Sequence, residues 1–271
     1  MTLDHRHSES AIANSKDDHK EHMEGMDEAA EAMKARPLIV KAYALGDPDA
    51  PSLDNPNVKH GHFLRHGQGF HNLMADLAKE AGRTWENCTN TPENPYVMPE
   101  ITDAPLTAKG RQQAAMVQPK ICGMDDTPQL VVLSPNCRAL QTGVIAFQDL
   151  LGKIPFLAHE MVREETGVHV CDKRRPTSQQ AAEFPMVDFS LLTDEQDTIF
   201  EHDRRETKAE LTERIYKFFE WLELREEKVV GVSSHSAWLL AVFNANLQAD
   251  ESLKGWFQTG ELRSVVLEFV R

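Results

Sequence analysis

The chain has 271 residues and a formal net charge of −14, with 41% hydrophobic and 27% charged residues. This composition is typical of a soluble globular protein that is long enough to bury a full core. The excess of acidic residues argues against nucleic acid as a partner, because proteins that bind phosphate backbones cluster Lys and Arg. The sequence holds no apolar run near the ~18 residues that span a bilayer, so we expect no membrane partner either.

The cysteines indicate a reducing compartment. They are widely spaced and form no C-x-x-C pair, so neither a zinc site nor a disulfide framework is expected. The polar, acidic start of the chain also differs from a signal peptide. We therefore predict a cytoplasmic protein with no metal and no other cofactor. The four cysteines are Cys88, Cys122, Cys137 and Cys171.

The first 36 residues differ in composition from the rest. Residues 1–36 are rich in acids and histidines and poor in large apolar side chains, so we expect a flexible acidic N-terminal arm followed by a single domain over 37–271. Ala, Glu and Met dominate residues 21–33, which favours a short helix there. The proline-containing segment 46–56 is interpreted as a loop that leads into the first buried strand.

Beyond that loop, short apolar runs alternate with segments of helical period. This alternation predicts a three-layer α/β/α fold with a mostly parallel central sheet. The expected strands are His62–Arg65, Leu130–Ser134, Phe156–Ala158, Val229–Ser233 and Val265–Val270. The expected helices are His71–Ala81, Thr107–Val117, Arg138–Leu150, Thr177–Phe184, Thr207–Leu224 and Ser236–Asn246.

Chemically active side chains follow three of these strands. Arg65 and His66 end the first, Arg138 opens the helix after the second, and His235 follows the fourth. Ligands of open α/β sheets bind beyond the carboxyl ends of the strands, so we expect these four side chains in one crevice. Two guanidiniums suit a tetrahedral phosphate, and an uncharged imidazole is a nucleophile that can form a phosphohistidine.

The motifs around these residues, taken in order, resemble the histidine phosphatase superfamily, also called the phosphoglycerate mutase-like family. They are Leu64–Arg65–His66–Gly67 with Asn72, Ser134–Pro135 with Arg138–Ala139 and Gln141–Thr142, and Ser234–His235–Ser236. The resemblance covers about residues 60–271 and implies a phosphoglycerate mutase-like fold. It also implies that His66 is the nucleophile, and that Arg65, Arg138 and His235 bind the phosphoryl group, with Asn72 as a further substrate-binding residue.

The family also needs an acid that protonates the leaving oxygen. Glu164 matches the acid of the family's Leu-Arg-Glu-x-x-Gly pattern, and its neighbour Glu165 is the alternative. Further along, residues 167–175 resemble a stretch in a plant, fungal and algal branch of the family. One of its consecutive basic residues is expected to reach the substrate, with Arg175 as the candidate. The alternative is a solvated turn in which an Arg pairs with Asp172 or Glu183.

The sequence departs from the mutases of the family. Those carry an acidic and then a hydroxyl residue after Arg-His-Gly, where Gln68 and Gly69 stand here. We therefore expect a phosphatase that acts on a phosphorylated small molecule. A phosphoglycerate-type mutase and a non-catalytic regulatory protein that binds phosphate both stay open. The sequence indicates neither the individual substrate nor the oligomeric state.

Overall fold

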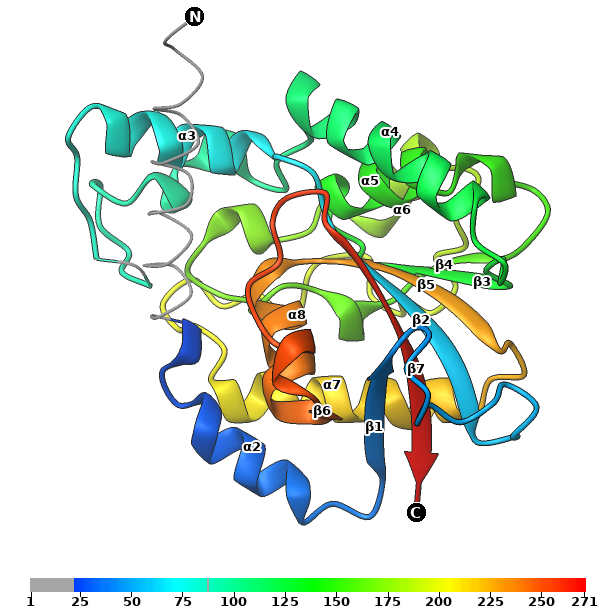
Figure 1. Ribbon diagram of the computed structural model, residues 1–271. Helices are drawn as coiled ribbons and strands as arrows, with labels where there is room; N and C mark the ends of the chain where they lie inside the picture. The colour runs from blue at the N-terminus through cyan, green and yellow to red at the C-terminus, as the bar shows by residue number, and fades with distance from the viewer. Residues whose placement is uncertain (1–21, 87) are drawn as a thin grey trace, which may run out of the picture.

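The computed structural model describes residues 22–86 and 88–271 and has a seven-stranded sheet at its centre (Figure 1). The strand order is β4-β3-β5-β2-β7-β1-β6. Strand β7 runs antiparallel to its neighbours β1 and β2, and the other neighbouring pairs are parallel. The predicted, mostly parallel sheet is thus confirmed. The strands are β1 (Ile39–Ala44), β2 (Val58–Arg65), β3 (Leu130–Leu133), β4 (Phe156–Ala158), β5 (Val229–Ser234), β6 (Leu247–Ala249) and β7 (Leu262–Val270).

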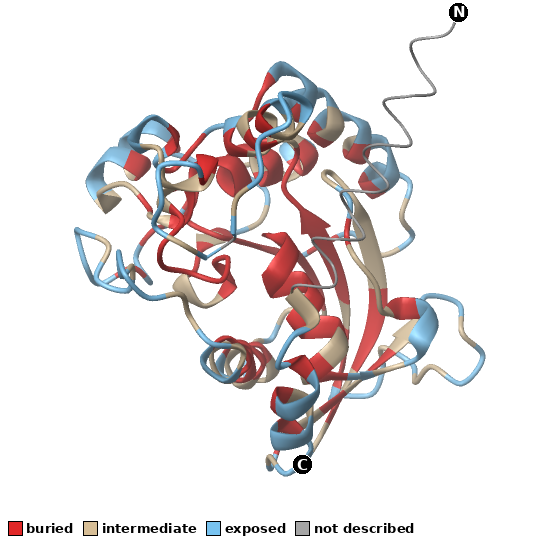
Figure 2. Cartoon of the chain, turned by 90° about the vertical axis from the view of Figure 1, so that its left-hand side faces the viewer, coloured by how far each residue is buried: buried red, intermediate tan, exposed pale blue. Residues whose placement is uncertain are grey.

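Helices cover both faces of the sheet, which completes the predicted three-layer arrangement. Consecutive residues of β2 point to opposite faces, so Phe63 packs with α2, α7 and α8, whereas Leu64 packs with α4 and α5. The central strands and α8 are buried (Figure 2). The α-helices are α2 (Met26–Lys34), α3 (Phe70–Glu80), α4 (Ala108–Cys122), α5 (Cys137–Ala146), α6 (Thr177–Glu183), α7 (Lys208–Glu223) and α8 (Ser236–Ala241).

Two strands were missed by the sequence pattern. We had expected the proline-containing loop to lead into the first strand. Strand β1 precedes this loop, which instead joins β1 to β2. Strand β1 pairs with β7 from the other end of the domain, and the short β6 pairs with β1. The predicted helix Ser236–Asn246 is also divided: α8 ends at Ala241, and a π-helix covers Val242–Asn246.

The N-terminal segment corrects the predicted boundary at residue 36. Residues 1–21 lie outside the described residues. Helix α2 is part of the fold, because it packs against α7 and the π-helix Val242–Asn246. Met26, Ala29 and Met33 recur at helical spacing and are buried in the core. Because these apolar residues are few, the composition of the whole segment concealed them. The helix that we expected within residues 21–33 is present as α2.

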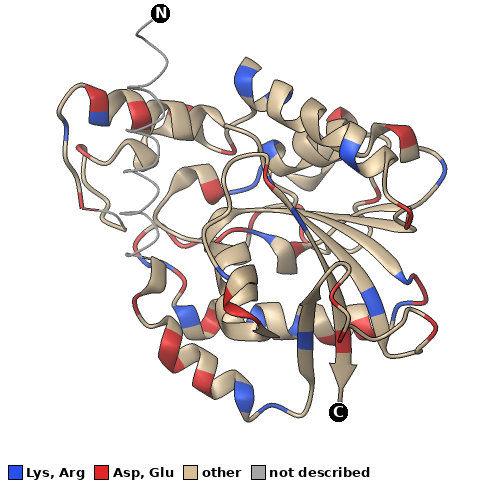
Figure 3. Cartoon of the chain, in the orientation of Figure 1, with Lys and Arg blue, Asp and Glu red and all other residues tan. Residues whose placement is uncertain are grey.

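Acidic and basic residues are interspersed along the helices (Figure 3). In α2, for example, Asp27 and Glu28 in the first turn precede Lys34 in the last turn, which matches the helix dipole. Within the described part of the chain, no helix is long and apolar enough to cross a membrane.

If α2 belongs to the core, Met26→Ala should lower the free energy of unfolding by about 2–4 kcal/mol, because it removes a side chain that is 1% exposed. Urea denaturation measures the change. The control is Met116→Ala. Met116 is 66% exposed, so this substitution should lower the free energy of unfolding by less than about 0.5 kcal/mol. Equal effects of the two substitutions would show that α2 is not part of the cooperative fold.

Candidate active site

Three adjacent parallel strands deliver the candidate residues to one edge of the sheet. Strands β3, β5 and β2 are neighbours, and they end directly before Ser134, His235 and His66. Backbone bonds continue beyond the strand ends, since the N–H of His66 donates to the carbonyl of Ser234 at 2.9 Å. The rings of His66 and His235 lie 5.1 Å apart between centroids. The structure therefore brings together side chains that lie 169 residues apart in sequence.

The loop after β2 is held by close backbone packing. A Cβ atom on Gly67 would lie 2.3 Å from the carbonyl oxygen of Gly110 in α4, so a larger residue does not fit there. The N–H of Gly67 donates to Oγ1 of Thr142 in α5. Asn72 lines the pocket, and its Oδ1 accepts the N–H of Gly69 at the start of α3. Gly67 thus allows the close packing of this loop against α4.

The hydrogen bonds of His66 define its tautomer. Its Nδ1 lies 2.7 Å from the carbonyl oxygen of Gly67, which can only accept, so Nδ1 carries the proton. Its Nε2 accepts a hydrogen bond from Nε of Arg138 at 3.3 Å. The lone pair of Nε2 therefore faces a guanidinium in the pocket, as a nucleophile for an anionic group requires.

Burial and positive charge keep this imidazole neutral. His66 is 1% exposed, and burial together with the charges of Arg138 and Arg65 holds its pKa well below the usual 6.5. Burial and the charge of Arg138 also lower the pKa of His235. Nε2 of His235 lies 2.7 Å from the hydroxyl of Ser134, and its buried Nδ1 has no hydrogen-bond partner among the described residues.

The two guanidiniums of the site come from different elements. Arg65 ends β2, donates from Nη1 to the carbonyl of Phe257, and lies with its Cζ 5.2 Å from the ring centroid of Trp256. Arg138 lies in the first turn of α5 and is 1% exposed. Its Nη2 donates to the carboxylate of Asp172 at 2.7 Å. The pocket thus contains two guanidiniums, and the carboxylate of Asp172, which also lines it, compensates the charge of Arg138.

Glu164 is surrounded by hydrogen-bond donors at the start of α8. Its carboxylate oxygens accept the N–H groups of Ala237 and Trp238, the N–H of Glu165 and the hydroxyl of Ser236, at 2.9 to 3.2 Å. These donors stabilise the negative charge that remains after a carboxylic acid has given up its proton. Glu164 lines the same pocket as His66.

The neighbouring Glu165 has a different environment. It forms ion pairs with Lys208, with Arg205 at 3.5 Å and with His22 at 3.5 Å. Burial raises its pKa, but the hydrogen bond to His22 and the charges of Arg205 and Lys208 outweigh burial, and the pKa lies far below its ordinary value. Glu165 is therefore held ionised.

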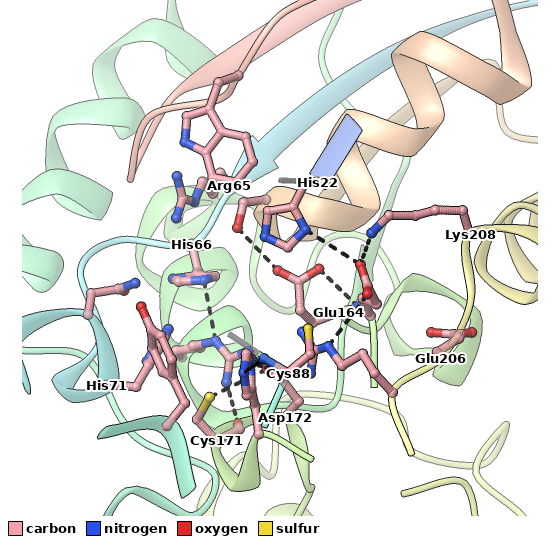
Figure 4. A pocket seen from close by; sticks show the side chains of 18 of the residues that line it. His22, Arg65, His66, His71, Cys88, Glu164, Cys171, Asp172, Glu206 and Lys208 are labelled. Carbon is pink, nitrogen blue, oxygen red and sulfur yellow. Dashed lines mark hydrogen bonds and ion pairs between the residues drawn. The ribbon is translucent and has the colours of Figure 1, made fainter. Parts of the chain in front are cut away.

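The pocket around these groups has a volume of about 520 Å³ (Figure 4). It contains Arg65, His66, Asn72, Arg138 and Glu164 among its lining residues. His235 is not among the lining residues, but its ring packs against the ring of His66. Several further residues line the pocket that the sequence had not indicated as site residues: His22, Tyr96, His169, Arg205, Lys208 and Trp256.

Arg175 does not line the pocket, which corrects our expectation that it binds substrate. Its guanidinium is held outside the pocket by Asp103 at 3.0 Å and Glu183 at 2.8 Å. The alternative interpretation had proposed such a pairing with Glu183. Arg174 is also engaged elsewhere, with Glu160 and backbone carbonyls. The described residues contain no group of three His, Cys, Asp or Glu side chains placed to hold a metal ion.

Comparison with known proteins gives one matching family. The profile described as "Histidine phosphatase superfamily (branch 1)" matches residues 89–271. "Phosphoglycerate mutase-like protein 1" of Arabidopsis thaliana is 31% identical over 239 residues, which cover 76% of this chain and 80% of the relative. "Probable phosphoglycerate mutase PMU1" of Saccharomyces cerevisiae is 27% identical over 248 residues, with coverage of 78% and 81%.

Solved structures are similar at lower identity. The ecdysone phosphate phosphatase of Bombix mori, in complex with tungstate, is 19% identical and has a TM-score of 0.45, with 68% of this chain and 75% of that chain covered. The phosphoglycerate mutase of Thermus thermophilus is 19% identical with a TM-score of 0.41, and coverage is 76% and 91%.

Because several buried histidines have a lowered pKa, we expect the fold to become less stable in acid. Burial lowers the pKa of His62 and of His159 to about 4, and it also holds the pKa of His66 and of His235 well below the usual 6.5. Below pH ~6.5 the unfolded chain therefore binds more protons, and each such histidine removes up to about 1.4 kcal/mol of unfolding free energy per pH unit until its folded pKa is reached.

Urea denaturation at about pH 7, 6 and 5 measures this dependence. His62→Gln should make it less steep, whereas His202→Gln, at an exposed position, should leave it unchanged. An unfolding free energy that stays constant between about pH 6.5 and 5 would contradict the neutral, buried histidines.

Proposed function

Because the chain belongs to branch 1 of the histidine phosphatase superfamily, whose members bind phosphorylated small molecules, we propose that it is a phosphomonoester hydrolase that works through a phosphohistidine. One observation carries this proposal. Nε2 of His66 holds an unprotonated lone pair 3.3 Å from Nε of Arg138, inside a pocket that also contains Arg65 and Glu164. A neutral nucleophile, cations for the phosphoryl oxygens and an acid are thus present together.

In the first step Nε2 of His66 attacks phosphorus. The new N–P bond forms as the bond from phosphorus to the leaving oxygen breaks. The guanidiniums of Arg65 and Arg138 bind the phosphoryl oxygens, and His235 lies beside the nucleophile as a further phosphoryl ligand. Glu164 donates its proton to the leaving oxygen, so the product leaves as an alcohol.

In the second step water replaces the imidazole. The carboxylate of Glu164 now accepts a proton from water, whose oxygen attacks phosphorus while the N–P bond breaks. Inorganic phosphate leaves, Nε2 of His66 recovers its lone pair, and Glu164 is protonated again. The two N–H groups of α8 that reach Glu164 support the carboxylate between the steps.

Glu164 suits the role of proton donor better than Glu165. Glu165 forms ion pairs with Lys208 and Arg205, so its protonation would weaken its attraction to both cations. The carboxylate of Glu164 has no cation among its hydrogen-bond partners in the described structure. Its charge can therefore change during a reaction without breaking an ion pair.

A phosphoglycerate-type mutase is the second candidate, and Arg205 and Lys208 favour it. Both line the pocket, and basic residues of this kind are what a second anionic group on a substrate needs. Phosphorus NMR separates the two reactions. A hydrolase releases inorganic phosphate from a panel of phosphomonoesters, whereas a mutase moves the phosphoryl group between two hydroxyls of a phosphoglycerate without releasing it.

His66→Ala should lower turnover on the order of 10³-fold or more, because no neighbouring group supplies the attack. In the wild type, rapid quenching in mild alkali should trap a phosphoryl group that acid then removes, as a phosphoramidate requires. His202→Ala, at an exposed position, serves as the control and should retain both turnover and trapping. Wild-type turnover in His66→Ala would disprove the proposed nucleophile.

Glu164→Gln tests the acid through the leaving group. With an alkyl phosphate, which has a poor leaving group, the turnover of this variant should fall about 10²-fold or more. With an aryl phosphate, turnover should fall far less. The matched control is Glu165→Gln, which disturbs ion pairs but removes no proton donor, so it should slow both substrates equally. Reversal of this pattern would move the acid to Glu165.

A further inference from the structure

The stretch 167–175 contributes a carboxylate to the pocket that the proposed reaction does not use. Asp172 is 3% exposed, and two guanidiniums occupy its two oxygens. Its Oδ1 accepts Nη2 of Arg138 at 2.7 Å, and its Oδ2 accepts Nη1 of Arg205 at 2.7 Å. Asp172 lines the pocket, and Figure 4 shows it on the side away from Arg65. One carboxylate thus links two cations of the site.

Asp172 also fixes the orientation of Arg138. Nη1 of Arg138 donates to the carbonyl of Cys171 at 2.5 Å, next to the contact of Nη2 with Asp172. The remaining nitrogen, Nε, donates to Nε2 of His66. Because the guanidinium is planar and held at both Nη atoms by residues 171–172, these residues determine where Nε meets the nucleophile.

The carboxylate is itself held in place. The backbone carbonyl of Asp172 accepts Nη2 of Arg163 at 2.7 Å and the amide of Asn136 at 3.2 Å. Burial raises the pKa of Asp172, but the charges of Arg205 and Arg138 outweigh burial and lower it below its usual value. Asp172 therefore acts as a fixed, charged acceptor.

Arg205 depends on the same carboxylate. Its side chain is 10% exposed and lines the pocket, and Nη1 also donates to the carbonyl of Gly167 at 2.8 Å. Its Nε lies 3.5 Å from Glu165 and makes no hydrogen bond within the described part of the chain. Without the second oxygen of Asp172, Arg205 and Arg138 would compete for a single acceptor.

We propose that Asp172 is a positioning residue, whose two oxygens hold Arg138 against the phosphoryl group and His66 and keep Arg205 apart on the side of Glu165. This inference rests on the proposed function only in taking Arg138 as a phosphoryl ligand. Its consequence is specific: an acceptor with one oxygen cannot replace the carboxylate while both guanidiniums are present.

Binding of vanadate, an analogue of the transferred phosphoryl group, tests the proposal without turnover. Asp172→Asn keeps the shape of the side chain but offers one acceptor oxygen and one NH₂ donor. We expect vanadate affinity to fall about tenfold or more, the loss associated with a charge-assisted hydrogen bond. The control is Asp126→Asn, which alters a carboxylate that pairs with His60 and does not line the pocket, and which should leave vanadate affinity unchanged.

The double variant Asp172→Asn with Arg205→Gln separates positioning from a merely structural role. Removing Arg205 leaves the single amide oxygen to Arg138, so vanadate affinity should recover by at least about threefold over Asp172→Asn alone. The ratio of kcat to KM for a phosphomonoester should recover in parallel. An additive or greater loss in the double variant would overturn the proposal.

Asp172→Glu tests the proposal if Asp172→Asn fails to fold. It keeps the charge and moves the carboxylate by one methylene, so vanadate affinity should fall although the protein stays folded. Unchanged affinity would overturn the positioning role. A wild type that binds vanadate and hydrolyses no phosphomonoester would overturn the proposed function alone, and a wild type that does not bind vanadate would overturn both.

Discussion

The need to neutralise a buried guanidinium governs the architecture of this pocket. Arg138 is 1% exposed, and a charge taken out of water costs several kcal/mol unless it is paired and hydrogen-bonded. The chain meets this cost with residues 171–172, which supply a backbone carbonyl and a carboxylate. Those residues are anchored in turn by Arg163, whose own charge is compensated by Asp197 and Glu160. Positive charge in this pocket is thus balanced by a chain of ion pairs that extends well beyond it.

The same burial defines the state of the histidines. An imidazole surrounded by guanidiniums and removed from water is neutral, and only a neutral imidazole can attack phosphorus. The site therefore combines fixed positive charge with uncharged bases. Such an arrangement is unfavourable for stability, because Nδ1 of His235 is buried without a partner among the described residues and the cations repel each other. The extensive core on both sides of the sheet supplies the compensating stability.

The sequence predicts best those site residues that directly follow a recognisable apolar strand. His66, His235 and Arg138 follow strands that are apolar and short, so their convergence follows from the rule for open sheets. Asp172 and Arg205 belong to irregular segments, and their pairing with Arg138 is a tertiary property that no local pattern encodes. Strand β1 and the burial of helix α2 were missed because both depend on distant partners, and Arg175 was misjudged because Asp103 and Glu183 hold it elsewhere.

The adjacent residues Glu164 and Glu165 show how one short segment supplies carboxylates in two different environments. The carboxylate of Glu165 forms ion pairs with Lys208 and Arg205, whereas that of Glu164 accepts N–H and O–H donors. Ion pairs and N–H dipoles both favour an ionised carboxylate, but only the loss of an ion pair leaves an opposite charge without that partner. The positions of Lys208 and Arg205 therefore distinguish the surroundings of two carboxylates that are adjacent in sequence.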